Sequence, residues 1–225
     1  MSEFRRRLMM AAFAGGGGGG VVCPYEQTGL VFWLDGIEKG GNSGSWTDLI
    51  GGLVLTNHGC TFNADNVELD GTNYLDNNTA GLIVDTQSGY TIECCIQRDS
   101  SASYTLFVQN YQHSAAIQII SNLALISTSE RAAFLSLSFQ TGYNYALSFN
   151  QTRGLMNGVA KTPTANVGYA NYSQANISIG CRNQGEGHFI GKIYSIRIYN
   201  RELTQAEMLS NQQVDNQRFN LGLNI

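Results

Sequence analysis

The chain has few charged residues, very few prolines and no long apolar run. Of its 225 residues only 13% are Asp, Glu, Lys or Arg, and only two are Pro. No apolar segment approaches the roughly 18 residues of a membrane-spanning helix, so we expect no membrane-spanning helix. After Arg7 the acidic residues outnumber the basic ones. A negative body of this kind argues against nucleic acid as a ligand.

What the chain has instead is neutral polar surface and enough apolar residues for one domain. Hydrophobic residues make up 43% of the sequence, which suffices for a substantial core. Asn, Gln, Ser, Thr and Gly are abundant. A neutral polar surface favours hydrogen-bonding partners such as sugars or other protein surfaces.

The five cysteines lack the spacing of a metal site. Cys94 and Cys95 are adjacent, and consecutive residues of a strand point to opposite faces, so this pair cannot chelate one ion. Five is also an odd number, and the pattern favours buried free thiols over a disulfide framework. Free thiols fit maturation in a reducing compartment.

Residues 1–23 predict an extended arm on a flexible tether. Arginines interleave with apolar side chains and are followed by six glycines at 15–20. Such a segment can dock in a groove of a partner. The predicted assembly anchor comprises Arg5, Arg6, Arg7, Leu8, Met9 and Phe13. A cleaved secretion signal is the alternative, although its apolar core would be short and Val22, before Cys23, is not small.

In the body of the chain, apolar and polar residues alternate with a period of two, which is typical of strands. Apolar residues at every second position mark segments 90–96, 135–139, 143–149 and 194–199. Such alternation predicts two packed antiparallel sheets with one face of each strand buried. Thr204 and Glu207 then form a capping box, which predicts one short helix. We expect a body over 24–213 and an extension over 214–225 that packs along an edge or reaches a neighbour.

The order of motifs resembles the LamG-like jelly-roll family of concanavalin A-like lectins and glucanases. The tail reads Phe-Ile-Gly-Lys-Ile from Phe189, then Tyr-Asn-Arg-Glu-Leu from Tyr199 and the capped helix. Earlier motifs follow the same family order: Trp-Leu-Asp-Gly from Trp33, Glu-Leu-Asp-Gly from Glu68, Thr-Ile-Glu from Thr91 and Met-Asn-Gly-Val from Met156. The resemblance covers about residues 29–212. It implies an all-β, antiparallel jelly-roll β-sandwich with one C-terminal helix.

That family contains lectins, glycanases and structural modules, so the fold leaves function open. A retaining glycosidase needs two carboxylates about 5 Å apart. Glu68 and Asp70 are the nearest approach, but no second glutamate follows them, and Asp70-Gly71 matches the family's non-catalytic turn. No nucleophile elbow is present either, and His58, His113 and His188 are scattered near expected loops. We predict that the protein is not an enzyme.

Candidate glycan-binding residues come from two sources. Trp46 and Tyr111 are aromatic residues suited to sugar stacking, and Asn183, Glu186 and His188 lie in a glycine-rich loop before the last strand. Trp33, in an apolar strand, is expected in the core. Calcium, common in the family, would find loop oxygens at Asp65, Asn66, Asp76, Asn77 and Asn78, although turn formation explains these residues equally.

Three functions follow as hypotheses. The first is a non-enzymatic virion component, such as a head fibre, decoration protein or tail appendage, that is anchored by its arm and oligomeric. The second is a secreted or surface carbohydrate-binding module, located outside the cell or on a bacterial surface. The third is a glycoside hydrolase, which the missing carboxylate pair disfavours.

Overall fold

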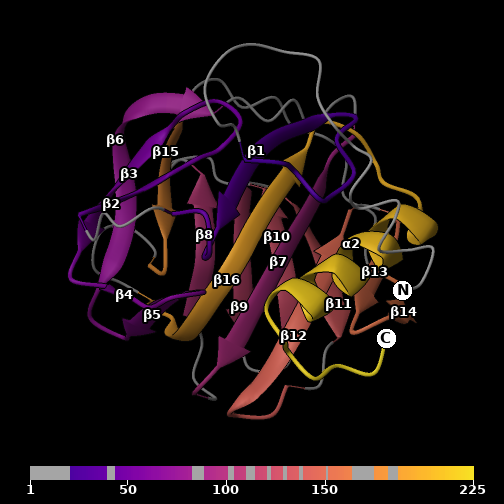
Figure 1. The fold of residues 1–225 in the computed structure, drawn as a ribbon. Coiled ribbons are helices and arrows are strands. Elements are labelled where there is room, and N and C mark those ends of the chain that lie inside the picture. Colours follow the sequence, from indigo (N-terminus) through magenta and orange to yellow (C-terminus); the bar gives the residue numbers. More distant parts are fainter. Residues whose placement is uncertain are drawn as a thin grey trace.

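The computed structural model describes residues 21–39, 44–82, 89–100, 104–109, 115–120, 123–128, 131–136, 139–150, 152–163, 175–181 and 187–225. These residues form two antiparallel sheets and one C-terminal helix, as the sequence predicts (Figure 1). Within the described residues, no helix is long and apolar enough to span a membrane.

The first sheet, called sheet A, runs in the order β14-β13-β12-β7-β16-β5-β4, and β1 also pairs with β16. Its central strand is β16, which contacts β7, β5 and β1 in antiparallel register. Its strands are β1 (Leu30–Asp35), β4 (Thr61–Phe62), β5 (Val67–Asp70), β7 (Thr91–Arg98), β12 (Tyr143–Phe149), β13 (Gly154–Met156), β14 (Val159–Lys161) and β16 (Ile190–Tyr199).

The second sheet, called sheet B, runs in the order β11-β10-β9-β8-β15-β6-β3-β2. Its strands are β2 (Ser45–Thr47), β3 (Val54–His58), β6 (Tyr74–Leu82), β8 (Tyr104–Gln109), β9 (Ala115–Ile120), β10 (Leu123–Thr128), β11 (Arg131–Ser136) and β15 (Ala175–Ile179). Hairpin pairs such as β9–β10 and β10–β11 keep continuous antiparallel register.

The main core lies between the two sheets. Apolar side chains from sheet A, such as Phe32 and Ile196, pack in one cluster with Leu55, Leu75 and Ile179 from sheet B. The arrangement is that of a β-sandwich, with buried faces supplied by the period-two pattern. All five cysteines are free and buried, which confirms the sequence prediction. Trp33 is buried as well, in a smaller cluster beneath the helix.

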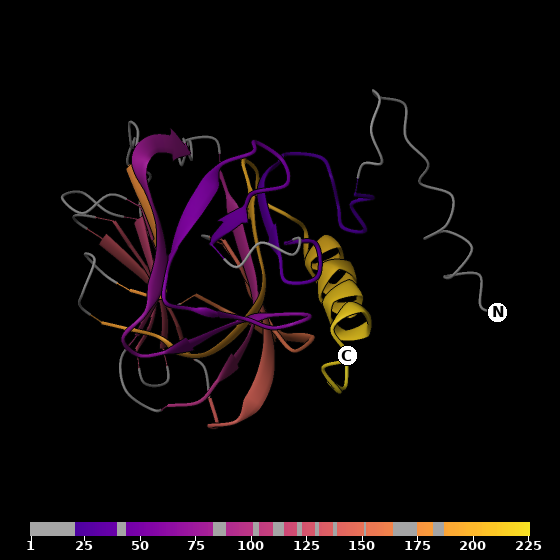
Figure 2. The ribbon, with the colours of Figure 1, turned by 60° about the vertical axis from the view of Figure 1, so that its left-hand side comes forward.

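Helix α2 (Gln205–Arg218) covers the outer face of sheet A (Figure 2). Thr204 caps it: the backbone N–H of Glu207 donates to the Thr204 hydroxyl, and the Glu207 carboxylate accepts from the Thr204 backbone. The predicted capping box is therefore confirmed. The predicted boundary between 213 and 214 is wrong, because the helix runs through it and Val214 and Asp215 are buried against the sheet.

The expectation that β16 is buried on one face only is wrong, because helix α2 covers its other face. Residues 193–199 are buried on both faces. Ile193, Ile196 and Ile198 belong to the core between the sheets. An irregular register between Ile193 and Ser195 places Tyr194 in a separate cluster with Phe219, beyond the end of the helix. Polar residues that alternation predicted to be exposed therefore lie under α2.

These covered residues form a charged network that we call the buried Arg197 cluster. The Arg197 guanidinium donates from Nε to Glu93 Oε2 (2.9 Å) and from Nη2 to Asp215 Oδ2 (2.7 Å). It lies over the Tyr25 ring, at 3.8 Å from the ring centroid, and the Tyr25 hydroxyl donates to Asp215 Oδ1 (2.9 Å). Ser195 also donates to Asp215 Oδ1. The cluster thereby joins β7, β16, α2 and the segment before β1.

Burial shifts the pKa values in this cluster. Removal of Glu93 from water raises the pKa of its carboxyl, and the positive charge of Arg197 offsets only part of this rise. Burial alone would lower the pKa of Arg197, but the Asp215 and Glu93 carboxylates outweigh that effect and raise it. The guanidinium therefore stays charged, and its planar group pairs with one oxygen of Glu93 and with both oxygens of Asp215.

Candidate functional site

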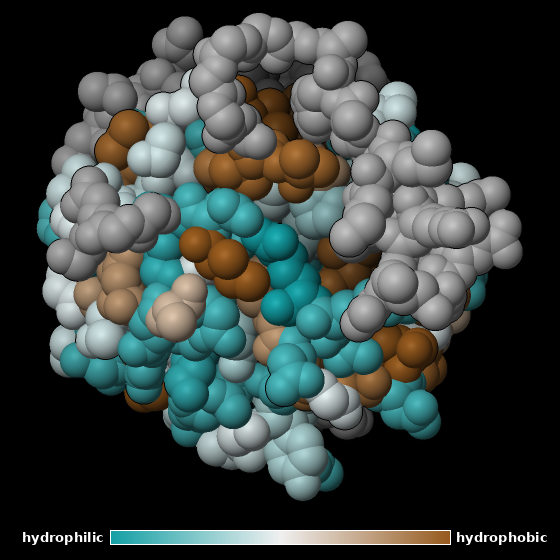
Figure 3. All heavy atoms as spheres, viewed as in Figure 1, coloured by the Kyte–Doolittle hydropathy of each residue, from teal (hydrophilic) through white to brown (hydrophobic). Residues whose placement is uncertain are grey.

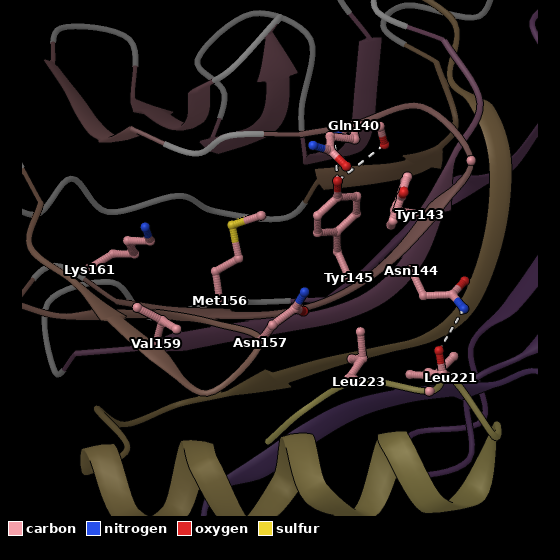
Figure 4. Close-up of a pocket in the computed structure, with 12 residues that line it drawn as sticks. Gln140, Tyr143, Asn144, Tyr145, Met156, Asn157, Val159, Lys161, Leu221 and Leu223 are labelled. Atoms are coloured by element: carbon pink, nitrogen blue, oxygen red, sulfur yellow. Dashed lines mark hydrogen bonds between the residues drawn. The ribbon is translucent and has the colours of Figure 1, made fainter.

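An open groove lies at one edge of sheet A, between the β12–β14 region and the C-terminal segment. Its volume is about 460 Å³, within the range of roughly 300–1,000 Å³ that ligand pockets usually have. Figure 4 shows the residues that line it. They are Gln140, Gly142, Tyr143, Asn144, Tyr145, Met156, Asn157, Val159, Lys161, Leu221, Gly222 and Leu223.

A tight turn builds one wall of the groove. Asn157 and Gly158 both have positive φ angles, of 49° and 76°, as a two-residue hairpin turn requires. They connect β13 to β14 as a β-hairpin, at the Met-Asn-Gly-Val motif that begins at Met156. The Asn157 side-chain oxygen accepts from the Ala146 backbone N–H (2.8 Å), which fixes the turn against β12.

The C-terminal segment forms the opposite wall. The Asn144 amide Nδ2 donates to the Leu221 carbonyl (3.0 Å), and Asn144 Oδ1 accepts from the Tyr194 hydroxyl. Further along, Asn216 binds the backbone N–H and carbonyl of Leu223. These bonds hold the chain after α2 along the groove, where Leu221 and Leu223 present apolar side chains (Figure 4).

Two tyrosines of β12 differ in exposure. Tyr145 is buried and forms part of the floor, and its hydroxyl binds the Gln140 backbone. Tyr143 precedes it by two residues but is 60% exposed, at the open end of the groove (Figure 4). An exposed tyrosine ring beside amide side chains is a suitable surface for the apolar face of a sugar, with hydrogen bonds to its hydroxyls.

The lining carries one charge. Among the described residues that line it, Lys161 is the only charged side chain, and they include no carboxylate, histidine, cysteine or serine. Among the described residues Lys161 takes part in no ion pair with an acid. The groove thus has an aromatic ring, amides and one lysine that can bind a ligand, and its described lining contains no pair of carboxylates of the kind that most glycoside hydrolases use.

A second polar group lies on sheet B, which we call the His58 cluster. The His58 imidazole stacks on the Tyr74 ring, with centroids 4.3 Å apart and planes at 18°. His58 Nε2 lies 2.7 Å from Asp76 Oδ1, and Asp76 is buried while the His58 side chain is 35% exposed. His58 is the last residue of β3 and precedes the bend at Gly59, which agrees with the predicted position near a loop.

The prediction of Trp46 as a sugar-stacking residue is wrong. Trp46 is fully buried between the sheets, and its indole Nε1–H donates to the Asp35 carbonyl (3.2 Å). Its ring packs against Phe62, with centroids 6.4 Å apart. β2 is short, and the face that carries Trp46 is the face toward the core, so the ring supports the sandwich.

Several other predicted residues lie outside the described part of the structure. These are Tyr111, Asn183 and Glu186 of the glycan-binding set, and Arg5, Arg6, Arg7, Leu8, Met9 and Phe13 of the arm. They stay predictions. His188 is described, and it is only partly buried, just before the core residue Phe189. At the other end of the tether, Cys23 and Tyr25 already pack with the body.

The predicted calcium residues fall in two places. Asp65 and Asn66 precede β5 of sheet A, where Asn66 donates to Asp65 within a turn. Asp76 and Asn77 lie in β6 of sheet B, where Asp76 binds His58 and Asn77 donates to the Val54 carbonyl. The side chain of Asn78 lies outside the described set. In the described ranges, no group of three or more His, Cys, Asp or Glu could hold a metal ion.

The carboxylates considered for glycoside hydrolysis serve turns. Asp70 Oδ1 accepts from the Thr72 hydroxyl and from its backbone N–H, each at 2.8 Å, and these bonds hold the pKa of Asp70 below its usual value. Glu68 accepts from the Asn63 amide (3.0 Å). A general acid for this reaction needs a raised pKa, which is the opposite of the shift at Asp70.

The sequence indicated the groove only in part. The Asn157-Gly158 turn was evident, but Tyr143 was assigned to the same buried row as Tyr145. Tyr143 is exposed because it begins β12, at the end of the strand beside the open groove. The sequence predicted that the extension packs along an edge or reaches a neighbour, but it did not indicate that residues 221–223 line a groove.

Comparisons with known proteins agree with the fold. No family model matches the chain, and no curated protein sequence matches it. Among solved structures it resembles Trypanosoma rangeli sialidase, with a TM-score of 0.62 at 13% identity over 95% of this chain and 37% of the sialidase chain. It also resembles the botulinum neurotoxin type G receptor binding domain, with a TM-score of 0.63 at 13% identity over 84% of this chain and 52% of that domain.

The binding domain of botulinum neurotoxin serotype D is similar as well, with a TM-score of 0.62 at 11% identity, covering 83% of this chain and 52% of that one. The chain thus spans between about a third and a half of these proteins. At such low identity the likeness shows a shared β-rich fold alone.

Proposed function

We propose that the protein is a non-enzymatic, concanavalin A-like jelly-roll domain that binds carbohydrate in the groove beside β12–β14. The observation that carries this proposal is the exposed Tyr143 ring next to amide side chains in an open groove. Aromatic rings with nearby amides suit sugars, because sugars combine an apolar ring face with many hydroxyl groups. Among the described lining residues there is no carboxylate, which supports binding over hydrolysis by a carboxylate pair.

The comparisons give limited support to this proposal. One similar structure is a sialidase in complex with sialic acid, and another is a receptor binding domain of a toxin. The shared fold makes recognition of a sugar or receptor a reasonable class of function, although fold by itself does not decide function.

The test is binding to a glycan array by the wild type and by two tyrosine variants. Tyr143→Ala removes the exposed ring of the groove, and Tyr74→Ala removes the ring that stacks on His58. We expect Tyr143→Ala to lose binding by at least about tenfold, since stacked aromatic groups often dominate recognition. Tyr74→Ala is expected to bind as the wild type does. Loss of binding in Tyr74→Ala alone would move the site to sheet B, and no binding to any glycan would refute the proposal.

A second candidate function is display from a larger assembly, such as a virion, through the N-terminal arm. The specific observation is the firm attachment of the residues that follow the tether. Tyr25 binds Asp215, the Glu26 backbone N–H donates to Asn211 Oδ1 (3.0 Å), and the Tyr199 hydroxyl donates to the Glu26 carbonyl (3.0 Å). A force or partner acting on the arm would therefore be transmitted to the centre of sheet A.

Deletion of residues 1–20 tests this second function. The body has its own core and its contacts begin at Cys23, so the shortened protein should fold with an unchanged unfolding free energy. We expect it to lose incorporation into the assembly, because the arm's apolar and cationic side chains would supply the contacts to a partner's groove. Assembly at wild-type stoichiometry, or a mature protein that begins at or after Cys23, would contradict this function.

A further inference from the structure

We propose that the groove selects acidic oligosaccharides, with the anionic group of the ligand at Lys161 and a neutral sugar ring at Tyr143. This inference rests on the proposed carbohydrate-binding function and adds the chemical class of the glycan. It is argued from the charge and layout of the groove.

The charge of the lining favours an anion. Lys161 is the only charged residue among those that line the groove, and it has no acidic partner in the described part of the chain. The protein as a whole carries a formal net charge of −4. A lysine ammonium with no carboxylate partner beside an open groove is available to a ligand's own carboxylate or sulfate, as a charge-assisted hydrogen bond.

The layout of the groove favours a ligand longer than one sugar ring. Lys161 lies at one end of the groove and Tyr143 at the other, with Met156 and Tyr145 between them (Figure 4). Met156 is buried and forms apolar floor, so the middle of the groove accepts a ring face. A ligand that reaches both ends therefore combines a stacked neutral sugar with an acidic one.

The geometry of the turn keeps the two ends in place. Asn157 and Gly158 hold β14 next to β13, where Met156 pairs with Val159 and Gly154 with Lys161. β13 in turn pairs with β12, whose first residue is Tyr143. The lysine backbone and the tyrosine backbone are thus connected through three hydrogen-bonded strands, which limits the conformational freedom lost when a ligand binds.

The experiment compares sugar pairs that differ by an acidic sugar residue or by a sulfate group, using the full chain. The probes are sialyllactose against lactose, and lactose sulfate against lactose, measured by titration calorimetry or by immobilised-glycan binding. Three proteins are compared: the wild type, Lys161→Gln, and the control Lys192→Gln. Lys192 lies in β16, pairs with Glu68 and Gln97 in register, and is not part of the groove.

We expect the wild type to bind at least one acidic probe about tenfold more tightly than lactose, because a charge-assisted hydrogen bond to Lys161 adds to the affinity. Lys161→Gln should bind acidic and neutral probes equally and keep its affinity for lactose. Lys192→Gln should keep the wild-type preference. The preference should also shrink as salt is raised from 0.05 to 0.5 M, because salt screens an exposed charge pair.

Two results would overturn the inference. If the acidic preference is absent, or persists in Lys161→Gln, the selection by Lys161 is wrong, while lactose binding that is lost in Tyr143→Ala would still support the proposed function. If the wild type binds neither the acidic nor the neutral probes, nor any glycan of the array, the proposed function fails and the inference fails with it.

Discussion

Sheet A contains two polar regions: one lies on its outer face under helix α2, and the other lies along its β12–β14 edge. Under helix α2, Glu93, Arg197 and Asp215 are fully buried and pair with one another. At the edge of the same sheet, the groove presents Tyr143 and Lys161 to solvent, with no acidic partner for the lysine in the described residues. A polar residue in a strand therefore contributes to stability where another element covers it, and it is available for binding where none does.

The difference has an energetic reason. A buried charge is tolerated only when its partners satisfy it, because removal from water costs several kcal/mol per ion. The Arg197 cluster meets that condition with two acids, a serine hydroxyl and a tyrosine ring. Among the coloured residues of the face in Figure 3, hydrophilic residues fill most of the centre and lower part, and hydrophobic groups lie above and beside them. Exposed polar groups carry no such cost and stay available to a ligand.

The largest expected effect comes from breaking the buried cluster. Arg197→Met leaves Glu93 and Asp215 buried without their common cation, and we expect a loss of about 4 kcal/mol in the free energy of unfolding. Chemical denaturation at pH 7 measures it. The matched variant replaces all three residues, Arg197→Met with Glu93→Leu and Asp215→Leu, and should regain most of the loss. A single variant as stable as the wild type would show that the cluster contributes nothing.

The apolar layer between the sheets should give a slightly smaller effect. Leu75 is fully buried in β6, and Leu75→Ala removes apolar contact and leaves a cavity, for an expected loss of about 3 kcal/mol. Leu75→Met keeps the volume and should cost less than about 1.5 kcal/mol. Chemical denaturation measures the free energy of unfolding of both variants. Equal losses in the two variants would mean that the site is not packed as described.

Glu207 provides a pH-dependent effect at the start of the helix. Hydrogen bonds from Arg201, together with those from Thr204, lower the pKa of Glu207 to about 2. A carboxyl whose pKa is lowered by folding stabilises the folded state above its unfolded pKa, and the contribution is lost as pH falls from about 4.5 to 2. Glu207→Gln should cost about 1 kcal/mol at pH 7, since the group is partly exposed and capping has this magnitude.

The measurement is the free energy of unfolding of both proteins between pH 7 and pH 2. The difference between them should shrink over the lower part of that range. Glu202→Gln is a useful control, because Glu202 lies beside the helix start but outside the capping box. A difference that is constant with pH would exclude the carboxylate as its cause.

The smallest effect on stability is expected in the groove. Tyr143→Ala and Lys161→Gln should each change the free energy of unfolding by less than about 0.5 kcal/mol, as surface substitutions usually do. Their effect should fall on sugar binding instead. A loss of more than about 1.5 kcal/mol in Tyr143→Ala would show that the ring supports the fold, and its loss of binding could then not be assigned to the groove.

Much of the fold could be predicted from short-range patterns. Strands β7, β12 and β16, the Asn157-Gly158 hairpin and the Thr204–Glu207 capping box all follow from spacing of two or three residues. These features depend on neighbours in the sequence, where propensity and hydrogen-bonding reach are local. Free cysteines were also predictable, from their number and spacing.

The candidate site could not be predicted in the same way. Trp46 and Tyr143 are both aromatic residues near polar ones in the sequence, yet one is buried in the core and the other is 60% exposed. Which of them is exposed depends on the strand's place in the sheet and on the elements that cover it. Leu221 and Leu223 approach Tyr143 only because Asn144 and Asn216 bind their backbone.

By itself, the sequence determined that this protein is built from antiparallel strands ending in one capped helix, because period-two burial and capping act between near neighbours. Only the tertiary structure decided that α2 crosses the outer face of sheet A, turning Glu93, Arg197 and Asp215 into a buried cluster. It also placed Tyr143 and Lys161 beside the C-terminal residues 221–223, where the groove forms at the β12–β14 edge. Such contacts join residues about 50–190 positions apart, and their energy depends on the covering element, which no local pattern encodes.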